Sequence, residues 1–201
     1  MKYGRLRIVA ILFGSTLVWS FNSLTTAVAE EGAHQHGVSH LNIAIEGNHL
    51  EMELIVPGSD AVGFEHSPST TEDRKAVQAA AKNFKDGMQL FVFSAAANCR
   101  FEHTKLQSSL LDKHSGHKHH AHKKHDHAKH SSRQDKKASK EPHAEFHVHY
   151  HIECANPGKL TYIDARFFKS FPSAQKLVTR WVTARGQGAA TLTPAKTRLT
   201  F

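Results

Sequence analysis

The chain has 201 residues and a formal net charge of +8, from 26 Lys and Arg against 18 Asp and Glu. This length allows one domain of ordinary size or two small ones. The excess positive charge lies in the N-terminal segment and in residues 108–142, while the rest of the chain is balanced. A nucleic-acid-binding domain would carry basic residues on its folded surface, so the charge distribution argues against that class.

Residues 1–29 have the pattern of a secretory signal peptide. Basic residues precede an apolar run at 8–19, and Ala27-Val28-Ala29 then supplies the small residues of an A-x-A cleavage site. The apolar run is too short to span a bilayer, and no later run is long enough to do so. We therefore expect cleavage after Ala29 and a periplasmic mature chain that begins at Glu30 and has no stable membrane insertion.

Residues 30–107 contain two stretches, 41–45 and 50–56, in which apolar and polar side chains alternate around a Gly47-Asn48 turn. This period of two with a tight turn predicts a β-hairpin with one buried face. Residues 68–70 then open a helical pattern that Gly87 is placed to end. Apolar side chains recur along it at helical spacing, at Val77, Ala81, Phe84 and Met88. Residues 90–93 and 100–106 are expected to form two further strands.

Residues 108–142 consist largely of histidine, lysine, serine and aspartate. Such a segment cannot bury enough apolar surface to offset its ordering entropy, so we expect a disordered linker. Eight of the 18 histidines lie in it: His114, His117, His119, His120, His122, His125, His127 and His130. The segment could be a solvated spacer, but dense histidine in an exported protein favours a tract that collects several metal ions weakly.

Residues 143–201 read as a second copy of the same plan. Alternation at 146–152, a turn at 156–158 and an apolar stretch at 160–168 predict a second pair of strands. Residues 172–186 are expected to form a helix that Gly186 ends. Its apolar side would carry Leu177, Val178, Trp181 and Val182. Residues 189–192 and 197–201 are expected to close the chain as strands.

The segment Phe64-x-x-x-Pro68 recurs as Phe168-x-x-x-Pro172, which supports a duplication. We therefore predict an α+β fold with two similar ββαββ-like halves, 30–107 and 143–201. Each half alone is marginal for independent stability, so the halves should pack on each other, with the disordered histidine-rich linker between them.

Cys99 and Cys154 are the two cysteines of the chain. In an oxidising compartment such a pair favours a single disulfide bridge. The alternative is that both are thiolate ligands of a metal, although no C-x-x-C spacing is present for a closed cysteine zinc site.

Several other histidines share the face of a predicted strand. Alternate positions of a strand point to the same side, which groups His143, Glu145, His147, His149 and His151. A second set near the mature N-terminus also shares one parity: His34, His36 and His40. Two related halves could bring both sets together, and neutral imidazole suits zinc, copper and nickel. Glu65-His66 is either part of a metal site or a structural turn in which His66 contacts a backbone carbonyl.

The motifs of the mature chain resemble those of the ZrgA-type periplasmic zinc-uptake proteins. They are His34-Gln35-His36-Gly37 with Leu41-Asn42-Ile43-Ala44, Val62-Gly63-Phe64-Glu65-His66-Ser67-Pro68, Cys99, His143 to His147 with Tyr150 and Cys154, and Phe168-x-x-Phe171-Pro172. The resemblance implies an exported protein that binds several Zn²⁺ ions and assists zinc import through an ABC-type system. It also implies the periplasmic solute-binding component of that importer as a partner.

Strand faces and resemblance together give the candidate zinc ligands of the folded region. The first group is His34, His36, His66, His143, Glu145 and His147. A second, weaker group is His40, Glu65, His149 and His151.

Other functional classes fit the sequence less well. His143-Ala-Glu-Phe-His147 is not an H-E-x-x-H motif, and the chain has no G-x-S-x-G, P-loop or dinucleotide fingerprint, so we expect no enzyme. A zinc-dependent hydrolase is the remaining catalytic alternative. The solute-binding component of a zinc importer needs a longer chain. A periplasmic nickel or copper buffer would use the same ligands, and copper binds such ligands more tightly than zinc.

Overall fold

The computed structural model describes residues 35–112 and 144–201, which belong to one compact unit, Ala33–Phe201. In chain order the helices and strands are β1 (Val38–Glu46), β2 (His49–Pro57), α1 (Gly58–Ala61), α2 (Thr71–Lys85), α3 (Gly87–Leu90), β3 (Phe91–Phe93), β4 (Cys99–Gln107), β5 (Glu145–Cys154), β6 (Tyr162–Ala165), α4 (Phe167–Ser170), β7 (Lys176–Thr183), β8 (Gly186–Leu192) and β9 (Arg198–Thr200). Short 3₁₀ turns lie at Ala95–Ala97, Ser109–Leu111 and Pro157–Lys159.

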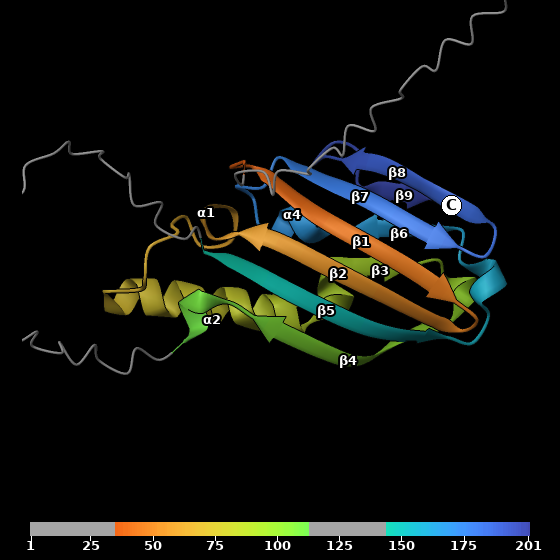
Figure 1. Ribbon diagram of the computed structural model, residues 1–201, viewed down its shortest axis with the longest axis horizontal. Helices are drawn as coiled ribbons and strands as arrows, with labels where there is room; N and C mark the ends of the chain where they lie inside the picture. Colours follow the sequence, from red (N-terminus) through yellow and green to blue (C-terminus); the bar gives the residue numbers. More distant parts are fainter. Residues whose placement is uncertain (1–34, 113–143) are drawn as a thin grey trace, which may run out of the picture. The chain divides into compact units, whose positions relative to one another are not determined.

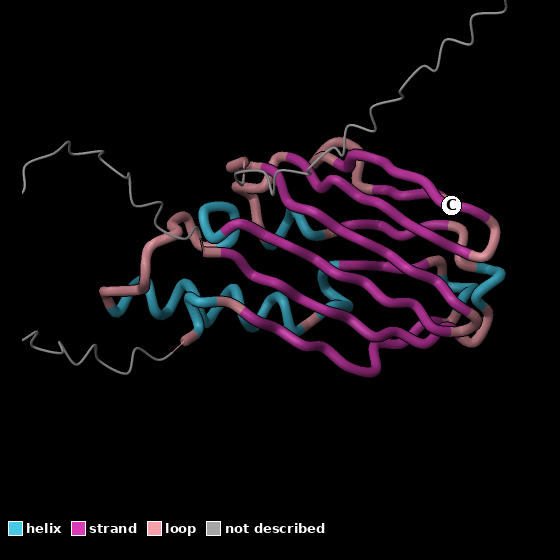
Figure 2. The backbone as a smooth tube through the Cα atoms, in the orientation of Figure 1, coloured by secondary structure: helices cyan, strands magenta, loops and turns pink. Residues whose placement is uncertain are grey.

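The strands form two sheets, so the fold is mixed α+β and rich in strands, as its class was predicted to be. The large sheet has six strands in the order β4-β5-β2-β1-β7-β8, and the small sheet has the order β3-β6-β9. Figures 1 and 2 show the large sheet in front, with α2 and the small sheet behind it. We call the side of the large sheet turned away from α2 and the small sheet its outer face.

The core lies between the large sheet and the elements behind it. Side chains alternate along β1, β2 and β5, so that every second residue is buried on the inner face. The ring of Phe84 on α2 lies 5.0 Å from that of Phe146, and Phe91 on β3 lies 6.0 Å from Tyr150. The Tyr150 hydroxyl donates to the Phe84 carbonyl oxygen at 2.7 Å. Tyr150 is therefore a core residue, and burial raises the pKa of its phenol, so that the proton is retained.

The helix α2 begins where the sequence predicts it. The Thr70 hydroxyl accepts from the Asp73 backbone N–H at 3.0 Å, and the Asp73 carboxylate accepts from the Thr70 N–H at 2.9 Å. This reciprocal pair satisfies backbone donors that a helix start leaves without intrahelical partners. One face of α2, with Val77, Ala80, Ala81 and Phe84, is buried in the core.

The helix predicted over residues 172–186 is wrong. Those residues form a turn and the strand β7, which lies parallel to β1 with Ile43 opposite Trp181. The segment is rich in β-branched and aromatic side chains, which fit a pleated surface better than a helix. Its apolar residues at 177–178 and 181–182 fit helical spacing, but in the structure Leu177 and Thr179 point inward while Val178 and Arg180 point outward. The helix of this region is instead the short α4.

The expected pair of ββαββ halves is consequently not confirmed. The strand β5, from the second segment, pairs with β2 on one side and with β4 on the other, both from the first segment. The strand β7 likewise extends the sheet beyond β1. The two segments therefore interleave within one sheet instead of forming two packed copies.

Cys99 and Cys154 are joined in a disulfide, as predicted. They lie directly opposite each other in the register of β4 and β5. Because both sulfur atoms are used in the bridge, neither cysteine is available as a metal thiolate. Within the described ranges, no helix combines the length and the apolar character needed to cross a bilayer.

Candidate metal-binding site

Three chain segments converge at one end of the large sheet, where β1 begins, β2 ends and β5 begins. Pro57, the last residue of β2, lies opposite Glu145, the first residue of β5. The Gly58 N–H donates to the Ala144 carbonyl oxygen at 2.7 Å, which ties the start of α1 to the start of β5. A side chain at Gly58 would meet this carbonyl at 2.9 Å and that of Phe64 at 2.6 Å. Glycine at this position thus lets the segment around Glu65 approach Glu145.

The first imidazole–carboxylate pair of this end is His36 with Glu65. His36 Nε2 lies 3.5 Å from Glu65 Oε1. The Glu65 side chain is only 15% exposed, whereas His36 is 70% exposed and can rotate toward a ligand. A mostly buried carboxylate is stabilised by pairing or by metal coordination, because burial alone disfavours its charge.

Asp60 on α1 holds the segment that carries His36. Its carboxylate accepts from the Gly37 N–H at 2.7 Å and from the Ser39 hydroxyl at 3.4 Å. Burial raises the pKa of the Asp60 carboxyl, while these two hydrogen bonds and the nearby His36 act in the opposite direction. The negative charge of Glu65 also raises that pKa, so His36, Asp60 and Glu65 share one local electrostatic field.

Asp60 was not among the candidates from sequence. A lone aspartate after a strand has no distinctive motif, and its burial follows only from how α1 folds back onto β1. One feature of the sequence could have identified Asp60. It follows closely after the apolar residues of β2, where a charged side chain is expected to be buried and therefore to require a partner.

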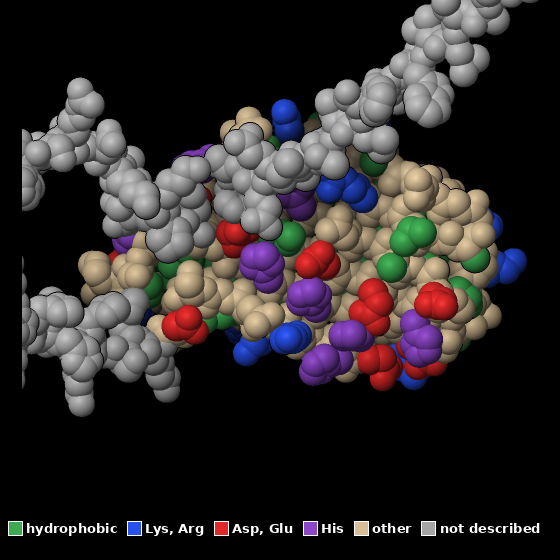
Figure 3. Space-filling view, viewed as in Figure 1, with side chains coloured by type: hydrophobic (Ala, Val, Ile, Leu, Met, Phe, Trp, Pro, Cys, Tyr) green, Lys and Arg blue, Asp and Glu red, His purple; other side chains and the backbone are tan. Residues whose placement is uncertain are grey.

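The second pair is Glu145 with His147, two residues apart on β5. Their Oε2 and Nε2 atoms are 3.6 Å apart, and the Glu145 side chain is 15% exposed. His40 on β1 and His147 both lie opposite Ile55 of β2 and therefore share the outer face, although the two related halves that were expected to bring them together are not present. Figure 3 shows histidine and acidic side chains gathered on this face.

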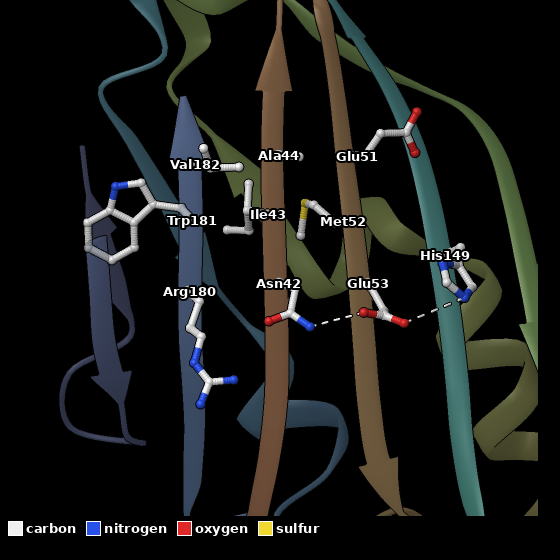
Figure 4. A pocket seen from close by; sticks show the side chains of 10 residues that line it. All are labelled: Asn42, Ile43, Ala44, Glu51, Met52, Glu53, His149, Arg180, Trp181 and Val182. Carbon is white, nitrogen blue, oxygen red and sulfur yellow. Dashed lines mark hydrogen bonds and ion pairs between the residues drawn. The ribbon is translucent and has the colours of Figure 1, made fainter. Parts of the chain in front are cut away.

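Further imidazole–carboxylate pairs continue along β5, away from this end of the sheet. His149 Nε2 lies 3.9 Å from Glu53 Oε1, and the Asn42 side chain donates to Glu53 Oε2 at 3.0 Å. Figure 4 shows these three residues in a row across β1, β2 and β5, in a hollow that Arg180 also lines. His151 Nδ1 lies 2.7 Å from Glu51 Oε1 one row further. The acidic side chains of β2 are thus paired across the sheet.

His66 lies at the surface in the segment before α2. Its Nδ1 is 3.1 Å from the Ser67 carbonyl oxygen, and its ring stacks on Phe64 at 4.7 Å. This contact with a backbone carbonyl is the one expected if His66 belongs to a structural turn. It also leaves Nε2 of His66 available to another partner.

The remaining candidates lie outside the described residues. They are His34, His143 and the histidines of the tract, His114, His117, His119, His120, His122, His125, His127 and His130. Among residues 35–112 and 144–201, no group of three or more His, Cys, Asp or Glu side chains is arranged to hold a metal ion. The described residues therefore contribute pairs of donors, and a closed site requires at least one donor from elsewhere or a side-chain rotation.

The donor chemistry nevertheless fits zinc. Zinc in proteins takes imidazole nitrogen and carboxylate oxygen at about 2.0 to 2.2 Å, and two such donors of a tetrahedral ion are about 3.3 Å apart. The His36–Glu65 and Glu145–His147 separations, 3.5 and 3.6 Å, are close to that spacing. Each pair could thus chelate an ion with small side-chain movements.

A mixed α+β fold with imidazole–carboxylate pairs along one sheet face defines a candidate metal-binding protein, and the comparison with known families identifies its class. The family model described as ZrgA family zinc uptake protein matches residues 33–201. The chain belongs to this family, as its motifs suggested. No curated protein matches the sequence.

Proposed function

We propose that this protein captures Zn²⁺ in the periplasm and assists its uptake through an ABC-type zinc importer. The observation that carries this proposal is the convergence of two imidazole–carboxylate pairs at one end of the large sheet, in a chain of a zinc-uptake family. In this proposal residues 1–29 are the signal peptide that directs export. The partner is the solute-binding component of the importer, which receives the ion.

The proposed folded site uses donors from the three converging segments. His36 and Glu65 supply one pair, and Glu145 and His147 supply the other. The closing donors are His34 and His143, each next in sequence to a described residue at this end, Gln35 and Ala144. Asp60 positions the His36 segment through Gly37 and Ser39. His66 and His40 lie in neighbouring segments as further donors.

The proposed role of the histidine-rich tract is to raise the local zinc supply. A segment that must order itself around each ion binds each one weakly. It nevertheless tethers loosely bound zinc at a raised effective concentration near the folded site. The tract therefore adds capacity, and the folded site adds affinity.

Zinc titration calorimetry on the mature chain tests this division. Deletion of residues 112–140 should lower the number of bound ions and keep the tightest phase. Combined replacement of His36, His143 and His147 by alanine should remove the tightest phase and keep the weak ones. The matched control is His49→Ala, because His49 is exposed on β2 at the opposite end of the sheet. A tight phase that survives the triple replacement, or that disappears with the tract, contradicts the proposal.

A nickel or copper buffer is the second candidate, since the same imidazole-rich donor set suits both metals. Metal analysis of protein purified from the periplasm, and growth of a deletion strain under zinc chelation, separate the two. Zinc import requires a growth defect that added zinc relieves and that added nickel or copper does not.

A further inference from the structure

Two histidines lie opposite each other on the outer face, in the middle of the β4–β5 pairing. His103 on β4 is directly opposite His151 on β5. Their ring centroids are 5.7 Å apart and the ring planes are tilted by 43°. Residues directly opposite in an antiparallel pair have Cβ atoms about 4.5 to 5.5 Å apart, so both imidazoles can reach one ion placed above the strands.

The carboxylate of Glu51, on β2, fixes one of these rings. Glu51 Oε1 lies 2.7 Å from His151 Nδ1, and Glu51 and His151 are opposite each other in the register of β2 and β5. When the carboxylate accepts a hydrogen bond from Nδ1–H, the proton stays on Nδ1 and the lone pair of Nε2 is left for a metal. A histidine that binds a metal commonly has its other ring nitrogen held in this way.

Both rings are accessible from solvent. The His151 side chain is 49% exposed, that of Glu51 is 50% exposed, and His103 is also at the surface. The neighbouring charges are largely engaged with one another: Arg100 contacts Glu102 and Glu153. The next outward-facing pair of β4 and β5, on the side toward His147, is Lys105 opposite His149. Within the described part of the chain, no segment has to move for an ion to approach the two imidazoles.

We propose that His103 and His151 form a second, solvent-exposed zinc site in which Glu51 orients His151. Water completes the coordination, because the described residues assemble no third protein ligand around the pair. A site with two protein ligands exchanges its ion readily, so it would serve as a loading point on the sheet. The choice of zinc as the ion rests on the proposed function. The placement of the two imidazoles is observed in the structure and does not depend on that function.

This site is distinct from the one at the other end of the sheet. His151 is four residues beyond His147 along β5, which corresponds to about 13 Å at the rise of a strand. One ion cannot bind both at once. His149, paired with Glu53, lies between them on the same face.

The test is a zinc titration of the mature chain followed through the imidazole NMR signals of His103 and His151. Free zinc is set by a chelator buffer, so that uptake by the histidine-rich tract does not alter it. In the wild type both signals should shift with one common midpoint. His103→Ala should raise the free zinc needed to shift His151 at least tenfold. Glu51→Gln should raise it about tenfold or more, the effect of removing a residue that orients a ligand.

His49→Ala is the matched control, because it removes another exposed histidine of the same sheet and should leave the midpoint unchanged. Separate midpoints for the two rings, no shift at all, or an unchanged His151 midpoint in His103→Ala would overturn the second site. The combined replacement of His36, His143 and His147 should leave this midpoint in place. The two experiments therefore test the two sites independently. A calorimetric result that contradicts the first site leaves the second site untouched, and a negative NMR result leaves the first site untouched.

Discussion

Asp60 shows how a single buried carboxylate can organise the candidate site without contacting a ligand. It is 4% exposed and holds the turn before β1 through the buried Gly37 N–H. Because burial raises the pKa of Asp60, its charged form costs free energy in the folded protein, and hydrogen bonds offset that cost. The oxygen acceptor, more than the charge, is what the fold requires at this position.

Replacement of Asp60 separates the contribution of its acceptor oxygen from that of its negative charge. Asp60→Ala should lower the free energy of unfolding by about 1 to 3 kcal/mol, because the buried Gly37 N–H loses its acceptor. Asp60→Asn keeps an oxygen for that N–H and removes the charge, so its stability should equal or exceed that of the wild type. Urea denaturation at neutral pH, with a chelator present to exclude metal effects, measures both. Equal destabilisation by the two replacements would contradict this assignment.

At the scale of the elements, the start of α2 depends on an ionised side chain. Hydrogen bonds from the backbone N–H and the hydroxyl of Thr70, with further ones from Ser69, lower the pKa of Asp73 to about 2. This pKa is below the unfolded value of 3.8, so the stabilisation is present at neutral pH and is lost as the pH falls from about 4 toward 2.

Asp73→Asn should therefore lower the thermal midpoint at neutral pH, and the difference from the wild type should shrink below about pH 4. Thermal unfolding followed by circular dichroism between pH 7 and pH 3 measures this. Glu72→Gln is the control, because Glu72 lies in the same first turn and is not part of the capping box. A difference that stays constant with pH would show that the Asp73 charge does not stabilise the helix.

The elements also show where sequence patterns were sufficient. The hairpin of β1 and β2, the helix α2 and the strand β5 each have a clear period and explicit boundary residues, such as Gly47 in the turn and Thr70 at the helix start. The strand β7 was not predicted, because the spacing of Leu177, Val178 and Trp181 fits both a helix and a strand. Its pairing with β1, a partner distant in sequence, decided between the two.

The site was only partly predictable for the same reason. Parity along β5 placed His147, His149 and His151 on one face correctly, because alternation is a local property. The approach of Glu65 to His36 depends on a loop that folds over Gly58, and the pairing of His103 with His151 depends on register. Neither the loop path nor the register of distant strands is encoded in a local pattern.

At the scale of the whole molecule, the disulfide joins β4 to β5 across a sequence separation of 55 residues that includes the histidine-rich tract. Closing a loop of this size restricts the unfolded chain. Replacing both Cys99 and Cys154 by serine should lower the free energy of unfolding by about 2 to 5 kcal/mol. Urea denaturation measures the loss, and the wild type under reducing conditions should match the variant. Thiol labelling of both cysteines in native, unreduced protein would contradict the bridge.

In the large sheet β5 lies between β2 and β4. The sheet therefore cannot form until the residues that follow the histidine-rich tract have been synthesised and have paired with the hairpin of β1 and β2. Glu51 and His151, which contact each other across β2 and β5, are 100 positions apart in the chain. Pairing between such distant strands is slow, because the intervening loop must be closed before its contacts stabilise it. Until then β2 and β4 keep open edges that can pair with other chains. The length of the tract should therefore affect the rate at which the protein folds, independently of any ion that it binds.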